Sequence, residues 1–183
     1  MKTHILIVDD SKLFSQGLSL LLEQYPKDID SIKMASNYNE ALTVLEKEIV
    51  NVIILDLNFE SEDYTGFTIA KKVKVLYPGI KVIILTQQAK IDNYEILFND
   101  IDVDGYLDKQ LGVDETLEAI KAVCIGEKYI DKSIASMLQI GKWLDITNRE
   151  KQIIKLLTIG LTQKEIAAKL FISSRTVETH IKN

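Results

Sequence analysis

Five short runs of β-branched and aliphatic residues recur along the first 125 residues, and amphipathic segments separate them. Three of the runs (HILIV, VIIL and VIIL) are almost continuously apolar, which is typical of parallel strands buried on both faces. Pro26 and Pro78 each lie between an amphipathic segment and the next run, where a helix must end. Five strand–helix units predict an α/β fold with a doubly wound, five-stranded parallel sheet. The predicted strands cover residues 4–8, 32–35, 52–55, 82–85 and 105–107.

Polar residues follow four of these strands at the point where each strand ends. Asp9 and Asp10 follow the first strand, Asp56 the third, Thr86 the fourth and Lys109 the fifth. In the strand order 2-1-3-4-5, ligands bind beyond the carboxyl ends of the first and third strands. Carboxylates that converge there repel one another unless a cation lies among them, and their oxygen atoms suit Mg²⁺. A lysine and a hydroxyl group beside that ion would bind a phosphoryl group.

The net charge of −5 is unevenly distributed along the chain. Residues 146–183 contain seven basic and three acidic side chains, a charge of +4, so residues 1–145 carry −9. This uneven distribution of charge indicates an acidic module that is joined to a basic module able to bind a polyanion.

The cysteine count, the length of the apolar runs and the N-terminus argue against a secreted, disulfide-linked or membrane-spanning protein. The single cysteine, Cys124, cannot form an intramolecular disulfide, which favours a reducing compartment. No apolar run reaches about 18 residues, the length of a membrane span. The N-terminus lacks the apolar core of a secretory signal, so we expect a cytoplasmic protein without a membrane segment.

The last part of the chain has the pattern of short capped helices. Thr147 and Glu150 form one capping box, Thr162 and Glu165 form another, and Gly160 ends the first helix. A third helix is expected to begin at Ser173 or Ser174. Two short helices joined by a tight turn predict a helix-turn-helix, whose second helix enters the major groove of DNA. The expected organisation is a domain over residues 1–125, a linker with one short helix over 126–145 and a smaller all-α domain over 146–183.

The strand-end residues resemble those of the receiver domain of two-component response regulators, a CheY-like, flavodoxin-like fold, over about residues 2–125. The resemblance implies that Asp56 accepts a phosphoryl group from a sensor histidine kinase. It also implies that Asp9, Asp10, Asp56 and the backbone carbonyl of Asn58 hold Mg²⁺.

The same resemblance assigns three residues to the response to phosphorylation. Lys109 would neutralise phosphoryl oxygens, Thr86 would shift towards them, and Tyr106 would turn inward as a coupled aromatic switch. The loop after Asp56 departs from the family pattern, because it lacks the usual proline and reaches its glycine, Gly66, later.

The segments GLTQKEIA and ISSRTVETH resemble the LuxR-type DNA-binding domain, and a receiver followed by this module is the NarL/FixJ order. By this resemblance one set of residues would face base edges and another would lie near phosphates. The first set is Glu178, Thr179 and Lys182; the second is Lys164, Ser174, Arg175 and Thr176. Glu178 departs from the pattern, because lysine is frequent at that position.

The family's further helix, which closes the bundle and pairs with a second subunit, would lie beyond Asn183. The sequence is therefore expected to be a C-terminally truncated regulator that does not bind DNA tightly. The leading hypothesis is a phosphorylation-controlled transcription regulator, which is not an enzyme and has a histidine kinase and DNA as partners; a homodimer also fits. Two alternatives stay open. One is a phosphorylation-controlled protein-interaction module, and the other is a Mg²⁺-dependent phosphohydrolase, although Asn58 stands where such enzymes place a second acid.

Overall fold

The computed structural model describes residues 2–58, 65–87, 91–136 and 147–182. The chain divides into two compact units, Met1–Ala135 and Ser136–Asn183. The first unit therefore extends past the boundary expected at residue 125. Residues 137–145 of the expected linker lie outside the described residues.

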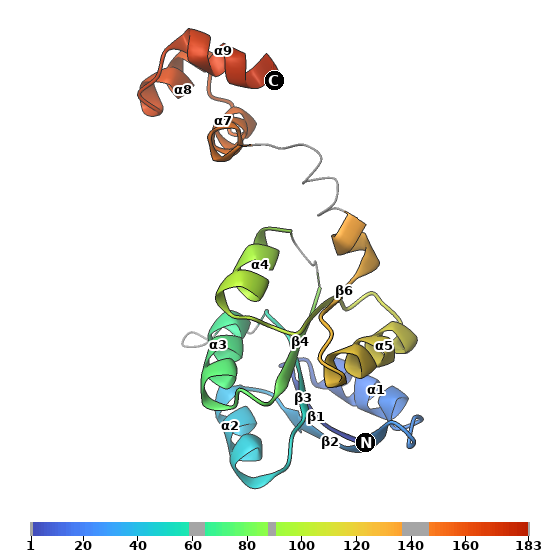
Figure 1. Ribbon diagram of the computed structural model, residues 1–183. Coiled ribbons are helices and arrows are strands. Elements are labelled where there is room, and N and C mark those ends of the chain that lie inside the picture. Colours follow the sequence, from blue (N-terminus) through green and yellow to red (C-terminus); the bar gives the residue numbers. More distant parts are fainter. Residues whose placement is uncertain (1, 59–64, 88–90, 137–146, 183) are drawn as a thin grey trace. The chain divides into compact units, whose positions relative to one another are not determined.

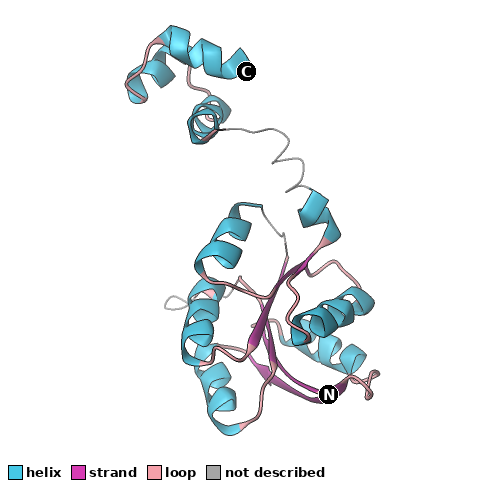
Figure 2. Ribbon diagram, in the orientation of Figure 1, coloured by secondary structure: helices cyan, strands magenta, loops and turns pink. Residues whose placement is uncertain are grey.

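The first unit is built on a sheet, drawn in magenta in Figure 2. The sheet is parallel and has the strand order β2-β1-β3-β4-β5-β6. The predicted order 2-1-3-4-5 is confirmed, but the prediction of five strands was wrong because β6 extends the sheet at its β5 edge. Two residues are too few to show an alternating pattern, so the sequence signal for β6 was absent. The strands are β1 (Thr3–Val8), β2 (Ile29–Ala35), β3 (Val52–Leu55), β4 (Lys81–Thr86), β5 (Gly105–Asp108) and β6 (Tyr129–Ile130).

Helices cover both faces of this sheet (Figure 1). Two of them, α1 (Lys12–Leu22) and α5 (Val113–Cys124), lie on one face. The other face carries α2 (Tyr38–Lys47), α3 (Gly66–Leu76) and α4 (Ile91–Glu95), which continues as a π-helical turn, η1 (Ile96–Asp100). The central strands are buried from both sides; all four residues of β3 are buried, for example. This explains why their sequences are continuously apolar instead of alternating.

The described part of the second unit, residues 147–182, contains three helices, α7 (Asn148–Thr158), α8 (Gln163–Lys169) and α9 (Ser174–Lys182). They enclose a small core of Ile153, Ile166, Ala167 and Val177. Both predicted capping boxes are present, and α9 begins at one of the two expected serines. Gly160 has a φ of +84°, a left-handed conformation that favours glycine and lets the chain leave α7 sharply.

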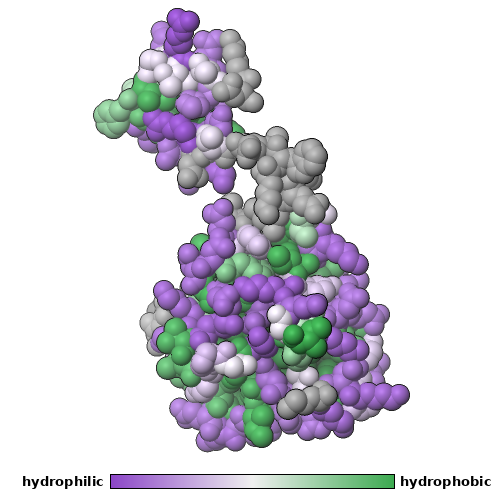
Figure 3. Space-filling view, viewed as in Figure 1, coloured by the Kyte–Doolittle hydropathy of each residue, from purple (hydrophilic) through white to green (hydrophobic). Residues whose placement is uncertain are grey.

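Hydrophilic side chains dominate the face of both units in Figure 3, where apolar residues gather only in small separate patches. Within the described part of the chain, no helix is long and apolar enough to span a membrane.

The first capping box makes a testable contribution to the stability of the second unit. The hydroxyl and the backbone N–H of Thr147 donate to the carboxylate of Glu150, each at 2.7 Å, and these bonds lower the pKa of Glu150 below its ordinary value of 4.5. A lowered pKa in the folded state means that the stabilisation is present above pH 4.5 and is lost as the pH falls through the lowered pKa.

Thr147→Ala should reduce the unfolding free energy of this unit by about 1 kcal/mol at neutral pH and weaken its pH dependence. Urea denaturation followed by the amide signals of α7 measures both effects. Thr158→Ala, which removes a hydroxyl at the other end of α7, should change neither.

Candidate phosphoryl-acceptor site

Three aspartates meet at the carboxyl ends of β1 and β3. The backbone N–H of Asp56 donates to the carbonyl of Val8 at 3.0 Å, which brings the end of β3 beside Asp9 and Asp10. One carboxylate oxygen from each aspartate lies within 4.8 Å of the others. Asp9 and Asp56 are buried, whereas Asp10 is exposed and opens the cluster to solvent.

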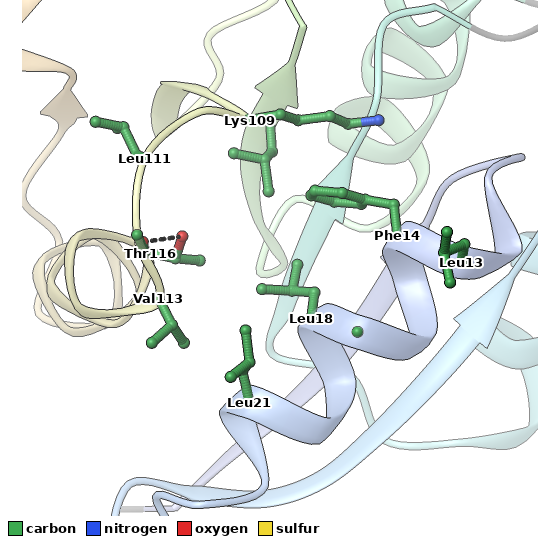
Figure 4. A pocket seen from close by; sticks show the side chains of 11 residues that line it. Leu13, Phe14, Leu18, Leu21, Lys109, Leu111, Val113 and Thr116 are labelled. Atoms are coloured by element: carbon green, nitrogen blue, oxygen red, sulfur yellow. Dashed lines mark hydrogen bonds between the residues drawn. The ribbon is translucent and has the colours of Figure 1, made fainter.

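Lys109 places a positive charge between two of these carboxylates. Its Nζ atom lies 2.6 Å from Oδ2 of Asp9 and 2.7 Å from Oδ2 of Asp56, and its side chain is only 6% exposed. The backbone N–H of Lys109 donates to the carbonyl of Thr86 at 2.8 Å, which anchors the turn after β5 to the end of β4. The lysine side chain also passes over the ring of Phe14, with Nζ 4.5 Å from the ring centroid (Figure 4).

The charge balance of the cluster fits a divalent cation. Three carboxylates and one ammonium group leave a net negative charge in a largely buried place, and the donors are all oxygen atoms, the ligands that Mg²⁺ prefers. Burial raises the pKa of Asp9, while the hydrogen bond and charge of Lys109 act in the opposite direction. Without a further cation, the repulsion between these carboxylates would destabilise the folded state. The residues present therefore fit Mg²⁺.

The end of β4 is linked to the phosphoacceptor candidate through Asn58. The backbone N–H of Asn58 donates to Oδ1 of Asp56, and its side-chain amide donates to Oγ1 of Thr86, both at 3.2 Å. The sequence assigned a role only to the backbone carbonyl of Asn58. The contact between its side chain and Thr86 joins residues far apart in the chain, so no local pattern predicts it. Tyr106 lies in β5 with its side chain fully buried.

Gly66 allows α3 to begin directly against the backbone of Asp56. A Cβ atom at this position would lie 2.3 Å from the carbonyl oxygen of Asp56 and 2.5 Å from Cα of Leu57. These are backbone atoms, so relief requires the helix or the loop to move.

We expect Gly66→Ala to lower the unfolding free energy by at least about 3 kcal/mol, the upper range for overpacking. Gly17→Ala is the matched control, because a Cβ atom at that helical position meets nothing within 4 Å. That variant should gain up to about 1 kcal/mol from helix propensity. Equal stability of the two variants in urea denaturation would contradict the close packing at Gly66.

Beside Lys109, an apolar groove of about 330 Å³ separates α1 from the start of α5. Phe14 and Leu18 line one side, and Leu111 and Val113 line the other (Figure 4). The aromatic ring of Phe14 belongs to both the groove and the site, which the helical pattern of the sequence alone did not reveal.

In the second unit, four of the seven residues predicted to contact DNA line one hollow beside α9. Ser174, Arg175, Glu178 and Thr179 line a hollow of about 540 Å³ together with Gln163, the first residue of α8. Gln163 directly follows the cap residue of α8 and was not among the residues predicted to contact DNA. Lys164 is exposed on α8 and Thr176 is half-buried, while the side chain of Lys182 lies outside the described residues.

Comparison with known families accounts for both units. The response regulator receiver domain matches residues 5–121, and the luxR family of bacterial regulatory proteins matches residues 145–183. The nitrate/nitrite response regulator protein homolog of Haemophilus influenzae is 33% identical over 188 residues, covering 100% of this chain and 88% of its own length. The oxygen regulatory protein NreC of Staphylococcus epidermidis is 28% identical and covers 96% of this chain and 86% of its own length.

Solved structures of the response regulator RcsB have the same fold. A structure of an RcsB–DNA complex is 26% identical, with a TM-score of 0.74, and covers 100% of this chain and 89% of its own. A structure of Salmonella typhimurium RcsB is 24% identical, with a TM-score of 0.76, and covers 99% of this chain and 90% of its own. The chain therefore belongs to the two-component response regulators and is a transcription regulator of the NarL/FixJ type, in which a receiver domain is joined to a LuxR-type DNA-binding domain.

Proposed function

We propose that Asp56 accepts a phosphoryl group from a sensor histidine kinase and that this event controls DNA binding by the second unit. The observation that carries the proposal is the buried carboxylate of Asp56, which lies 2.7 Å from the ammonium group of Lys109 and within 4.8 Å of the carboxylates of Asp9 and Asp10. A nucleophile with a cation on one side and a cation site on the other suits phosphoryl transfer.

In the proposed reaction a carboxylate oxygen of Asp56 attacks the phosphorus atom of a phosphohistidine. The new O–P bond forms an acyl phosphate as the P–N bond breaks, and the electron pair of that bond leaves with the imidazole. Mg²⁺ held by Asp9, Asp10, Asp56 and the carbonyl of Asn58 would supply further neutralisation of the phosphoryl oxygens.

The chain's own residues then stabilise the transferred group. Lys109 already lies beside Asp56 and would pair with a phosphoryl oxygen. The hydroxyl of Thr86 accepts a hydrogen bond from Asn58, so its own proton is available to donate to a second phosphoryl oxygen.

Direct labelling tests this proposal. The chain is incubated with a small acyl phosphodonor and Mg²⁺, the acyl phosphate is trapped by borohydride, and the modified residue is located by mass spectrometry. We expect modification at Asp56 and its loss when a chelator removes Mg²⁺. Labelling at another residue, or labelling that is indifferent to the chelator, would contradict the proposed roles.

For the second unit we propose that the exposed start of α9 contacts DNA. Residues 146–183 carry a charge of +4, and Arg175 lies exposed beside Glu178 and Thr179 in the hollow described above. A carboxylate repels phosphate but accepts a hydrogen bond from cytosine N4, so Glu178 would read a base. Lys164, Ser174 and Thr176 would contact phosphates, and Lys182 would contact a base. Because one RcsB structure contains dimers bound to DNA, we extend the proposal to a homodimer.

Electrophoretic shifts with a set of operator fragments test the DNA contacts. Arg175→Ala should weaken binding to all fragments by a similar factor and reduce its dependence on salt. Glu178→Gln should instead change the ranking of the fragments. Lys155→Ala, an exposed change of equal charge on α7, is the control for Arg175→Ala and should have the smaller effect.

A further inference from the structure

The segment Lys128–Ile134 lies along the β5 edge of the sheet, and we call it the strap. Its backbone hydrogen bonds to the β5 segment include those from Tyr129 N–H to the carbonyl of Asp104 at 2.9 Å and from Asp131 N–H to the carbonyl of Tyr106 at 3.0 Å. The register sets Ile130 opposite Tyr106, so the strap pairs with the middle of the strand that carries the predicted aromatic switch.

Side chains at the start of the strap attach it to the turn before β5, to η1 and to α5. Lys128 pairs with Asp102 in the turn before β5, and its Nζ lies 5.2 Å from the centroid of the Phe98 ring in η1. On the other side, the hydroxyl of Tyr129 donates to Glu118 of α5 at 3.0 Å.

The end of the strap is buried. Ile134 is 2% exposed, and the carboxylate of Asp131 is also buried. Oδ1 of Asp131 accepts from the backbone N–H of Ser133 at 2.5 Å and so begins the helical turn over residues 132–136. The strap is therefore an ordered part of the receiver unit, and the chain runs on from it towards the DNA-binding unit.

The strap and the phosphoacceptor site share one short element. Lys109, which contacts Asp56, directly follows the last residue of β5, and Tyr106, whose carbonyl holds the strap, lies three residues earlier. The backbone N–H of Lys109 also donates to the carbonyl of Thr86. β5 has only four residues and is hydrogen-bonded between β4 and β6, so the residue that contacts Asp56 and the carbonyl that holds the strap lie within one short strand and its next residue.

We propose that the strap senses the state of the phosphoacceptor site through the backbone of β5 and loosens when Asp56 is phosphorylated. The inference rests on the proposed function, because it needs Lys109 and Thr86 to move towards a phosphoryl group. Such a movement displaces the Tyr106 carbonyl from the Asp131 amide. The signal thereby reaches the segment from which the chain continues to the DNA-binding unit, without requiring a second subunit.

Hydrogen exchange in the full chain tests this coupling. The probe is beryllofluoride with Mg²⁺, a mimic of the phosphoryl group, and its binding is followed separately by ¹⁹F NMR. Amide protection reports local opening, so exchange at Tyr129 and Asp131 should become about tenfold faster when the mimic binds, within the usual range of allosteric coupling. Binding of the mimic with unchanged exchange at both amides would overturn the strap inference and leave the proposed function standing. Failure of the mimic to bind would overturn both.

A matched pair of proline variants tests the same coupling from the other end. Asp131→Pro deletes the N–H that donates to Tyr106 together with the buried carboxylate, and Asp131→Ala deletes the carboxylate alone. Ile130→Pro deletes an N–H that points away from β5, because successive peptide groups of a strand face opposite sides. Since coupling between two sites is reciprocal, Asp131→Pro should bind beryllofluoride about tenfold more tightly than the wild type, and Ile130→Pro should bind it like the wild type. Equal affinities of Asp131→Pro and either Asp131→Ala or Ile130→Pro would overturn the inference.

Discussion

Asp56→Asn is expected to abolish labelling of the chain by a phosphodonor in the presence of Mg²⁺, lowering its rate at least about 1000-fold. The amide has nearly the same shape as the carboxylate but lacks its charge and cannot form an acyl phosphate. The fold should persist, because Lys109 keeps its 2.6 Å contact with Asp9 and the surrounding strands are apolar and buried. Mass spectrometry of the trapped acyl phosphate measures the rate, and the amide spectrum checks the fold.

Asp30→Asn is the control for this change. Asp30 is a surface aspartate whose carboxylate lies 3.6 Å from Nζ of Lys2 and 3.7 Å from Nδ1 of His4, and such partly exposed contacts contribute little. Its variant should be labelled like the wild type. Labelling of the Asp56→Asn variant at the wild-type rate would reject Asp56 as the phosphoacceptor.

Lys109→Gln is expected to have two large effects. Removal of the ammonium group leaves the carboxylates of Asp9 and Asp56 without their shared cation, and breaking a buried ion pair on one side costs about 3–5 kcal/mol of unfolding free energy. The rate of phosphoryl acceptance should fall about 100- to 1000-fold, because one preorganised charge that faces the phosphoryl oxygens is lost. Urea denaturation without divalent ions measures the first effect, and labelling measures the second.

Magnesium separates the electrostatic explanation from simple loss of packing. Mg²⁺ should restore part of the stability of the Lys109→Gln variant, since the ion neutralises the same carboxylates. Adding Asp56→Asn to Lys109→Gln should also restore part of it, because neighbouring charges do not contribute additively. Lys121→Gln removes an exposed partner of Asp28 and should cost less than about 1 kcal/mol. A Lys109→Gln variant that neither Mg²⁺ nor Asp56→Asn stabilises would contradict the charge cluster.

The sequence by itself predicted the α/β class, the order of five strands and the convergence of the site. Asp9, Asp56 and Lys109 are far apart in the chain, yet each follows a strand whose apolar run is unmistakable. Because the carboxyl ends of parallel strands lie at one edge of the sheet, their order along the chain was enough to bring these side chains together. The capping boxes of the second unit were equally readable, since a cap and its partner lie within one helical turn.

Only the tertiary structure decided how these groups touch. The hydrogen bond from Asn58 to Thr86, the ring of Phe14 under Lys109 and the close approach of Gly66 to Asp56 join residues from different elements. Such contacts depend on how strands and helices pack against one another. A periodic pattern along one helix or strand therefore does not predict them.

The sixth strand is the clearest case of this limit. Tyr129 and Ile130 form too short a run to predict a strand, and they become one only because the edge of β5 offers unpaired backbone groups. Local patterns of apolar and polar residues thus determined the elements and their order. The edge of the folded sheet determined where the strap lies, and with it the coupling that we propose between Asp56 and the strap.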